Sequence, residues 1–267
     1  MSETKTFEEL FLSFSKEENL KVKHLKILII NNINSNYMYL IKLKEWQIKN
    51  QEYFDYLFFL GNFLSFSENK KKDDIKEISN DEAEIGGLLS YLENLCLNII
   101  YIGGKNDTST IFKTPYPTLT LRSVNLHQNY HKITEDLYLI GYGGNFYYDK
   151  FDNSIENSFN NFHDYLKENC NIKKIQTIFF CNEWFYGKTN LLNNRNDKIY
   201  ENIINNKNNH IFLNINGNIK IKKGTEILDK ITIINPGSIC EGEFAILILE
   251  RDKNNSWEIK SIDYLII

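Results

Sequence analysis

The stretch KILIINNINSN, residues 26–36, decides the fold. Residues 25–30 are a compact apolar run, interrupted only by Lys26, with the length and the β-branched content of a strand buried on both faces. The small polar residues that follow predict a loop. Helical periodicity comes next over residues 37–49, and a second apolar run covers residues 56–60. Strand, helix and strand in this order predict a βαβ unit with parallel strands.

Further apolar runs continue this alternation and then change it. Residues 82–95 predict a helix and residues 98–102 a third strand, which extends the parallel sheet. One more helix is predicted at residues 155–169. The remaining apolar runs are candidates for short strands, at residues 121–126, 131–133, 136–141, 174–181, 210–213, 231–234, 244–250 and 257–265.

Two polar regions lie outside this pattern. Residues 65–81 include three lysines followed by two aspartates, which predicts a charged, solvated insertion. Near the N-terminus, Leu10, Phe11 and Phe14 have helical spacing and predict a short amphipathic helix over residues 8–16. We therefore expect an N-terminal extension of residues 1–24 and a single domain of residues 25–267.

Composition and charge limit the class of protein. With 267 residues and 42% hydrophobic side chains, the chain supplies one large core. A net charge of −4 gives no basic footprint, so we expect no nucleic-acid partner. The four cysteines form no C-x-x-C pair, which favours reduced thiols inside a cell. The glutamate-rich start and the lack of a long apolar run predict a soluble intracellular protein, cytoplasmic or in another soluble compartment, neither secreted nor inserted in a membrane.

In open α/β sheets, chemistry gathers in the loops after the carboxyl ends of strands. Here these loops are predicted at residues 31–36, 61–63, 103–107, 181–187 and 214–217. In their order and apolar context they resemble the loops of calcineurin-like metallophosphoesterases, which carry D-x-H, G-D, G-N-H-D, a lone H and G-H-x-H. KILIINNINSN is similar to the family's K-I-L-V-V-S-D-I-H-G-N, FFLGNF to L-x-G-D-F, and IYIGGKNDTS to Y-V-P-G-N-H-D. CNEWFYG is similar to T-H-x-P-P-Y-G, and INPGSICEGEFAILILE resembles the V-N-P-G-S that leads into the last core strands.

The resemblance covers the chain from about Lys26 to Glu250 and implies an α/β fold. In that fold two packed mixed β-sheets are flanked by helices, as the metallophosphoesterase four-layer sandwich. It also implies where metal ligands and catalytic groups would lie. Carried over in chain order, these positions are Asn32, Asn34, Asn62, Lys105, Asn106, Asp107, Asn182, Asn214 and Asn216.

The resemblance also assigns these positions their roles. The bridging aspartate of the family falls on Asn62, the metal-binding asparagine on Lys105 and the general-acid histidine on Asn106. Asp107 alone keeps the family's carboxylate, and Glu183 is the other acid near the site. A carboxamide has the size of a carboxylate but no charge, and its oxygen is a weak ligand for a transition metal.

An ammonium at Lys105 would repel a cation or take its place. We therefore expect a pseudoenzyme with no metal and no cofactor. Because asparagine is abundant throughout the chain, drift after loss of catalysis is a simpler origin for these residues than a selected polar pocket.

Some relatives that have lost ligands use this fold as a scaffold, which implies a structural or adaptor subunit of a larger protein assembly. Two alternatives are a weakly active phosphatase or phosphodiesterase with a single metal, and a module that binds a phosphate or nucleotide without cleaving it. Aromatic side chains favour protein interfaces. The candidate partner contacts are the aromatic loop residues Trp184, Phe185, Tyr186, Phe146, Tyr147 and Tyr148.

Overall fold

The computed structural model describes residues 22–66, 75–112, 123–144, 154–169, 175–182, 210–217, 223–228 and 230–267. Sheet A contains β1 (His24–Ile30), β2 (Tyr56–Phe59), β3 (Ile99–Tyr101), β4 (Ser123–Asn125), β11 (Glu243–Arg251) and β12 (Trp257–Ile266). Sheet B contains β5 (Asn129–Lys132), β6 (Leu137–Tyr142), β7 (Gln176–Cys181), β8 (Ile211–Asn216), β9 (Gly224–Leu228) and β10 (Ile231–Asn235). The helices are α2 (Tyr37–Lys49), α3 (Ile75–Leu92) and α4 (Ser154–Asn169), and two short 3₁₀ turns are η1 (Ser109–Phe112) and η3 (Ile239–Glu241).

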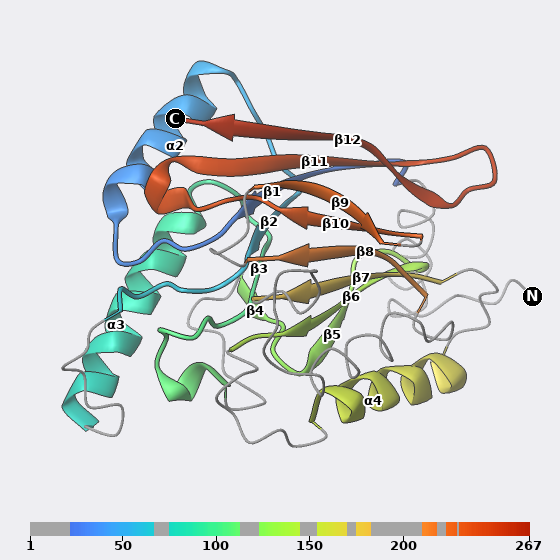
Figure 1. Ribbon diagram of the computed structural model, residues 1–267, viewed down its shortest axis with the longest axis horizontal. Coiled ribbons are helices and arrows are strands. Elements are labelled where there is room, and N and C mark those ends of the chain that lie inside the picture. Colours follow the sequence, from blue (N-terminus) through green and yellow to red (C-terminus); the bar gives the residue numbers. More distant parts are fainter. Residues whose placement is uncertain are drawn as a thin grey trace, which may run out of the picture.

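The two sheets are mixed and pack against each other (Figure 1). Sheet A has the order β12-β11-β1-β2-β3-β4, in which β1 to β4 are parallel and β11 and β12 are antiparallel to their neighbours. Sheet B has the order β5-β6-β7-β8-β10-β9, in which β6, β7, β8 and β10 are parallel. This arrangement confirms the predicted fold class.

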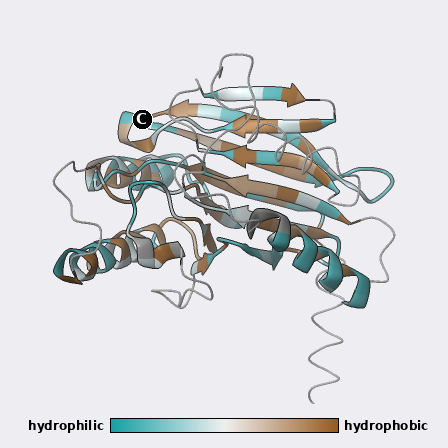
Figure 2. Ribbon diagram, turned by 60° about the horizontal axis from the view of Figure 1, so that its bottom comes forward, coloured by the Kyte–Doolittle hydropathy of each residue, from teal (hydrophilic) through white to brown (hydrophobic). Residues whose placement is uncertain are grey.

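Strand β1 explains why its sequence is apolar at consecutive positions. Ile27 and Ile29 face the core between the two sheets, whereas Leu28 and Ile30 face the core beneath α2 and α3. On the far side, Phe162 of α4 packs on Phe179 and other residues of sheet B. The layers are therefore helix, sheet, sheet and helix. Figure 2 shows the strands as largely hydrophobic and the helices as mixed along their length. Among the described residues, no helix is long and apolar enough to cross a membrane.

Some of the predicted helix and strand bounds need correction. Helix α2 has the predicted bounds, and the side chain of Asn36 caps it by accepting a hydrogen bond from the N–H of Met38 at 3.2 Å. Helix α3 begins at Ile75 rather than at residue 82, so residues 75–81 are helical and not a loop, and it ends at Leu92 rather than residue 95. Strand β9 was not predicted because three of its five residues are exposed and their apolar pattern is weak.

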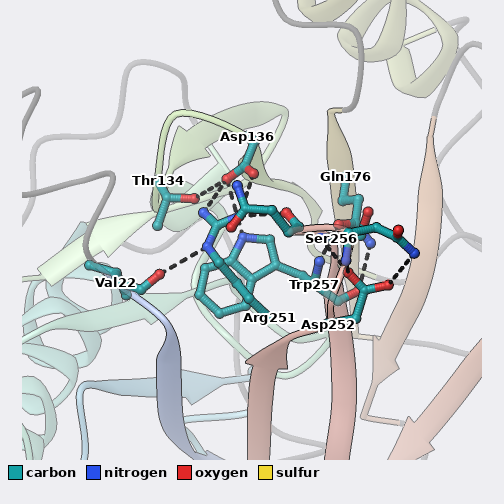
Figure 3. Close-up of polar contacts among 10 residues, drawn as sticks. Val22, Thr134, Asp136, Gln176, Arg251, Asp252, Ser256 and Trp257 are labelled. Atoms are coloured by element: carbon teal, nitrogen blue, oxygen red, sulfur yellow. Dashed lines mark hydrogen bonds and ion pairs between the residues drawn. The ribbon is translucent and has the colours of Figure 1, made fainter.

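A polar network joins the two sheets at the edge where β1, β6 and β7 begin (Figure 3). Arg251 of β11 donates to both carboxylate oxygens of Asp136, at 2.6 and 2.7 Å, and its guanidinium lies 4.3 Å from the ring centroid of Trp257. The indole N–H of Trp257 also donates to Asp136, at 3.2 Å. Gln176 donates to the carbonyl of Trp257 at 2.7 Å, so both sheets are held together at this edge. The opposite edge carries the candidate site.

Candidate functional site

The loops predicted to carry chemistry meet at the carboxyl-terminal edge of both sheets. The side chain of Asn182, after β7, donates to the carbonyl of Leu60, after β2. The side chain of Asn31, after β1, donates to the carbonyl of Gly217, after β8. These two hydrogen bonds connect sheet A to sheet B, because parallel strands that end together bring their following loops together.

Asn32 and Asn62 are in direct contact. The Nδ2 of Asn62 donates to the Oδ1 of Asn32 at 2.6 Å, and both side chains are buried. Both residues have positive φ, 56° for Asn32 and 60° for Asn62, a region that asparagine tolerates better than most residues. The Oδ1 of Asn62 also accepts from the backbone N–H of Asn106, at 3.3 Å. Asn32, Asn62 and Asn106 are thus connected, and the carboxamide of Asn62 takes part in both hydrogen bonds.

The loops after β2 and β3 approach so closely that glycine is required. A Cβ atom on Gly104 would lie 2.2 Å from the backbone nitrogen of Asn62. Gly61 has a φ of 96°, and a Cβ there would lie 2.5 Å from the backbone nitrogen of Gly104. The glycines therefore serve backbone contact between the two loops. The same contact brings Asp107 within hydrogen-bonding distance of both loops.

Asp107, the only carboxylate among the predicted positions, is bound by backbone N–H groups. Its Oδ2 accepts from Gly104 at 2.7 Å and from Asn62 at 3.1 Å, and its Oδ1 accepts from Leu64 at 3.0 Å. Burial raises the pKa of Asp107 to about 7, although these N–H groups act in the opposite direction. Both oxygens are used to join two loops. The carboxylate therefore holds the loops in place and is not free to ligate a metal.

Asn34 and Lys105 lie toward the rim of this edge. The Nδ2 of Asn34 lies 3.4 Å from the Sγ of Cys240, which in turn is 3.1 Å from the hydroxyl of Ser238. Lys105 is exposed to solvent. This exposure does not favour the hypothesis that its ammonium takes the place of a metal.

Asn214 and Asn216 lie inside strand β8 and not in a loop after it, which corrects the predicted bounds of that strand. Ile215 between them faces the core between the sheets, so both asparagines face the opposite side, toward α4. The Nδ2 of Asn214 donates to the carbonyl of Phe179 in β7, at 3.2 Å. This pair therefore does not join Asn32.

Gly217 directly follows β8, and a Cβ there would lie 2.6 Å from the Oδ1 of Asn31. The approach of Asn31 therefore requires glycine at this position.

Several buried carboxamide atoms have no hydrogen-bond partner within the described part of the chain. They belong to Asn31, Asn32, Asn34, Asn182, Asn214 and Asn216. An unsatisfied buried polar group costs roughly 1–3 kcal/mol. The contacts among the described residues therefore do not optimise the stability of this edge.

The donor set does not fit a pair of divalent metals. In the described ranges there is no group of three or more histidine, cysteine, aspartate or glutamate side chains placed to hold a metal. The described positions carried over from the family offer amide oxygens, one exposed lysine and one carboxylate already bound to the backbone. Two dications need anionic and imidazole ligands to offset their charge.

Some predicted residues fall outside the described ranges, and some relevant ones were not predicted. The aromatic contacts Trp184, Phe185, Tyr186, Phe146, Tyr147 and Tyr148 and the acid Glu183 lie outside the described residues. Conversely, Asn31 and Cys240 were not proposed as site residues, although Asn31 connects the two sheets and Cys240 contacts Asn34. Their sequence signal was the Asn31-Asn32 pair and the position of Cys240 two residues after the N-P-G-S turn.

Solved structures resemble this chain in fold. TT1561 of Thermus thermophilus has a TM-score of 0.60 and 16% identity, covering 89% of this chain and 98% of that one. A dimetal phosphatase from Danio rerio has a TM-score of 0.54 and 6% identity, covering 91% and 98%. GAP50, the anchor in the inner membrane complex of Plasmodium, has a TM-score of 0.51 and 12% identity, covering 92% and 89%. A search of the curated proteins finds no match.

The family itself is shown by the sequence. The model of the metallophosphoesterases of the calcineurin superfamily matches residues 20–258, which includes sheet B, sheet A except most of β12, and all the loops at the candidate site. This chain belongs to the calcineurin superfamily of metallophosphoesterases.

Proposed function

We propose that this chain is a catalytically inactive member of its family and serves as a structural or adaptor subunit of a larger protein assembly. The observation that carries the proposal is the 2.6 Å hydrogen bond from Asn62 to Asn32. In the family these positions hold a bridging aspartate and another metal ligand. Here two neutral side chains satisfy each other, and neither supplies the charge that a dication requires.

The remaining groups support the same proposal. Both carboxylate oxygens of Asp107 accept backbone hydrogen bonds, so this acid already has a structural role. The general-acid position is Asn106, and an amide does not protonate a leaving group near neutral pH. At the positions carried over from the family, the side chains that a two-metal mechanism and general-acid catalysis require are then lacking.

The solved structures of similar fold include both a phosphatase and an anchor protein. Their low identity to this chain supports the fold alone, so the choice between the two roles depends on this chain's own residues. Those residues favour the non-catalytic role. As the surface for a partner protein we propose the aromatic loops at residues 146–148 and 184–186, whose Trp and Tyr side chains are typical of binding hot spots.

Metal content and turnover test the catalytic half of the proposal. The purified full chain should hold no stoichiometric Mn, Fe, Zn or Co by elemental analysis after dialysis. It should not hydrolyse phosphomonoesters or phosphodiesters with added Mn²⁺. Two tightly held metal equivalents, or turnover that Asn62→Ala abolishes, would overturn the proposal.

Retention in the native assembly tests the adaptor half. The variant with Trp184→Ala and Phe185→Ala should keep the circular dichroism spectrum of the wild type and lose its co-purifying proteins. Tyr53→Ala, in which an exposed aromatic side chain between α2 and β2 is truncated, is the matched control and should retain them. Full retention by the double variant would rule out these loops as the main interface.

A further inference from the structure

Helix α2 has apolar side chains on its solvent face as well as on its core face. Tyr37, Ile41 and Ile48 are 37%, 40% and 65% exposed and fall on one side of the helix, since positions four and eleven residues apart align. Met38 beside them is 59% exposed. We call these four residues the α2 stripe. The buried side of the same helix, with Leu40 and Leu43, already packs on sheet A, so the stripe is additional to the core.

An exposed apolar row of this kind on one helix commonly marks a contact surface. A second amphipathic helix fits it best, because an apolar face presented at i, i+4 and i+11 suits another helix lying along it. The occupant must therefore offer apolar side chains at helical spacing.

We propose that residues 8–16 of the same chain dock as a helix on the α2 stripe. This segment, EELFLSFSK, lies outside the described residues, and Leu10, Phe11 and Phe14 in its sequence have helical spacing. The inference does not depend on whether the protein is catalytic.

The place where the described chain begins brings this segment within reach. Val22, its first residue, is held by Arg251, which donates to its carbonyl at 2.9 Å. Four residues later, Lys26 forms an ion pair with Glu52, just beyond the end of α2. Residues 17–21 can span roughly 17 Å when extended, and a nine-residue helix is roughly 13 Å long, about the length of the stripe.

Charge favours the same occupant. Helix α2 carries three lysines and one glutamate, and Lys42 and Lys49 are exposed near the stripe. The first twenty residues instead carry five glutamates, among them Glu8 and Glu9 at the start of the proposed helix. Opposite charges beside an apolar contact orient the two helices, although each exposed pair adds little to the strength of the contact.

Hydrogen–deuterium exchange on the full chain tests the docking. Ile41→Asp should release residues 8–16 and raise their exchange at least several-fold toward the rate of an unstructured peptide. Ile227→Asp is the matched control, because Ile227 is 71% exposed but belongs to β9, and this variant should leave that exchange unchanged. Unprotected exchange of residues 8–16 in the wild type, or no change in Ile41→Asp, would overturn the proposal.

A cysteine pair and the oligomeric state identify the occupant. Phe11→Cys combined with Ile41→Cys should form a disulfide within one chain on mild oxidation, whereas either single variant should not. Sedimentation should show the same monomer mass for the wild type and Ile41→Asp. A wild-type dimer that Ile41→Asp dissociates, or a disulfide that joins two chains, would show that a second copy occupies the stripe and would refute the proposal.

Discussion

The Nδ2 of Asn62 donates to the Oδ1 of Asn32 at 2.6 Å, so the loops after β1 and β2 contact each other through two neutral side chains. Two carboxylates at this distance would repel each other unless a metal lay between them. The amide of Asn32 has an Nδ2 that lacks a partner among the described residues. One amide nitrogen of the pair therefore donates and the other does not. Introducing a negative charge at each position in turn tests whether the two side chains are in contact.

Restoring aspartate at both positions should destabilise the metal-free protein by more than the sum of the single changes. In Asn62→Asp alone, the carboxamide of Asn32 can rotate and donate its Nδ2 to the new carboxylate, so the cost should be about 1 kcal/mol. The double variant Asn32→Asp, Asn62→Asp should show an additional coupling of about 2–3 kcal/mol. Urea denaturation in the presence of a chelator measures it. Additive free energies would contradict direct contact between the two side chains.

Asp107 should make the stability of the protein depend on pH. Because burial raises its pKa to about 7, the folded state keeps a proton that the unfolded state releases near its ordinary value. The contribution of this group to stability should therefore be greatest below about pH 4, fall as pH rises toward 7 and stay constant above it. Carbon-13 NMR of the Asp107 carboxyl should give a midpoint near 7. A midpoint at or below the ordinary value would show that its N–H donors outweigh burial.

His127 should act in the opposite direction. Burial lowers the pKa of His127 to about 4, and its Nδ1 accepts the N–H of Gly143 at 3.0 Å, which requires that nitrogen to be unprotonated. Stability from this group is complete above the unfolded pKa and falls by about 3 kcal/mol as pH drops from about 6.5 to 4. Proton NMR titration of the ring and denaturation of His127→Gln beside the wild type measure both effects. A ring midpoint near 6.5 would disprove the burial argument.

The bidentate pair between Arg251 and Asp136 should be among the strongest polar contributions to the sandwich. Removing one partner of a nearly buried, hydrogen-bonded pair costs about 3–5 kcal/mol, so Arg251→Ala should lower the free energy of unfolding by about that amount. Lys260→Ala, which breaks the exposed pair with Glu250, is the control and should lower the free energy of unfolding far less. Equal losses in both variants would show that Arg251 contributes nothing beyond a surface ion pair.

The sequence predicted the elements whose signals are local. Helix α2 was predicted to the residue, because its periodicity is uninterrupted and Asn36 provides a cap. Strand β8 was predicted too short, since Asn214 and Asn216 look like loop residues and their burial depends on β7 and α4. Helix α3 was predicted to begin too late because its first turns are polar and solvated.

For the candidate site, too, features set by local sequence were predictable, whereas features set by contacts between distant segments were not. Asn32 and Asn62 were placed correctly at adjacent strand ends, because strand order alone brings those ends together. The structural use of Asp107 was not predictable, since it depends on three backbone N–H groups from two separate loops. The exposure of Lys105 likewise depends on how its loop turns after β3.

Added metal should distinguish the wild type from the aspartate double variant. A ligand that binds only the folded state stabilises it by about 2.7 kcal/mol at a concentration of about one hundred times its dissociation constant. With neutral carboxamides, the wild type should show no shift in Tm with about 1 mM Mn²⁺, because no anionic ligand offsets the charge of the ion. In the variant Asn32→Asp, Asn62→Asp, two carboxylates face each other, so the same Mn²⁺ should restore part of the lost stability. A Tm increase of several degrees in the wild type would show that the native asparagines do hold a cation, and the inactive reading of this site would then be wrong.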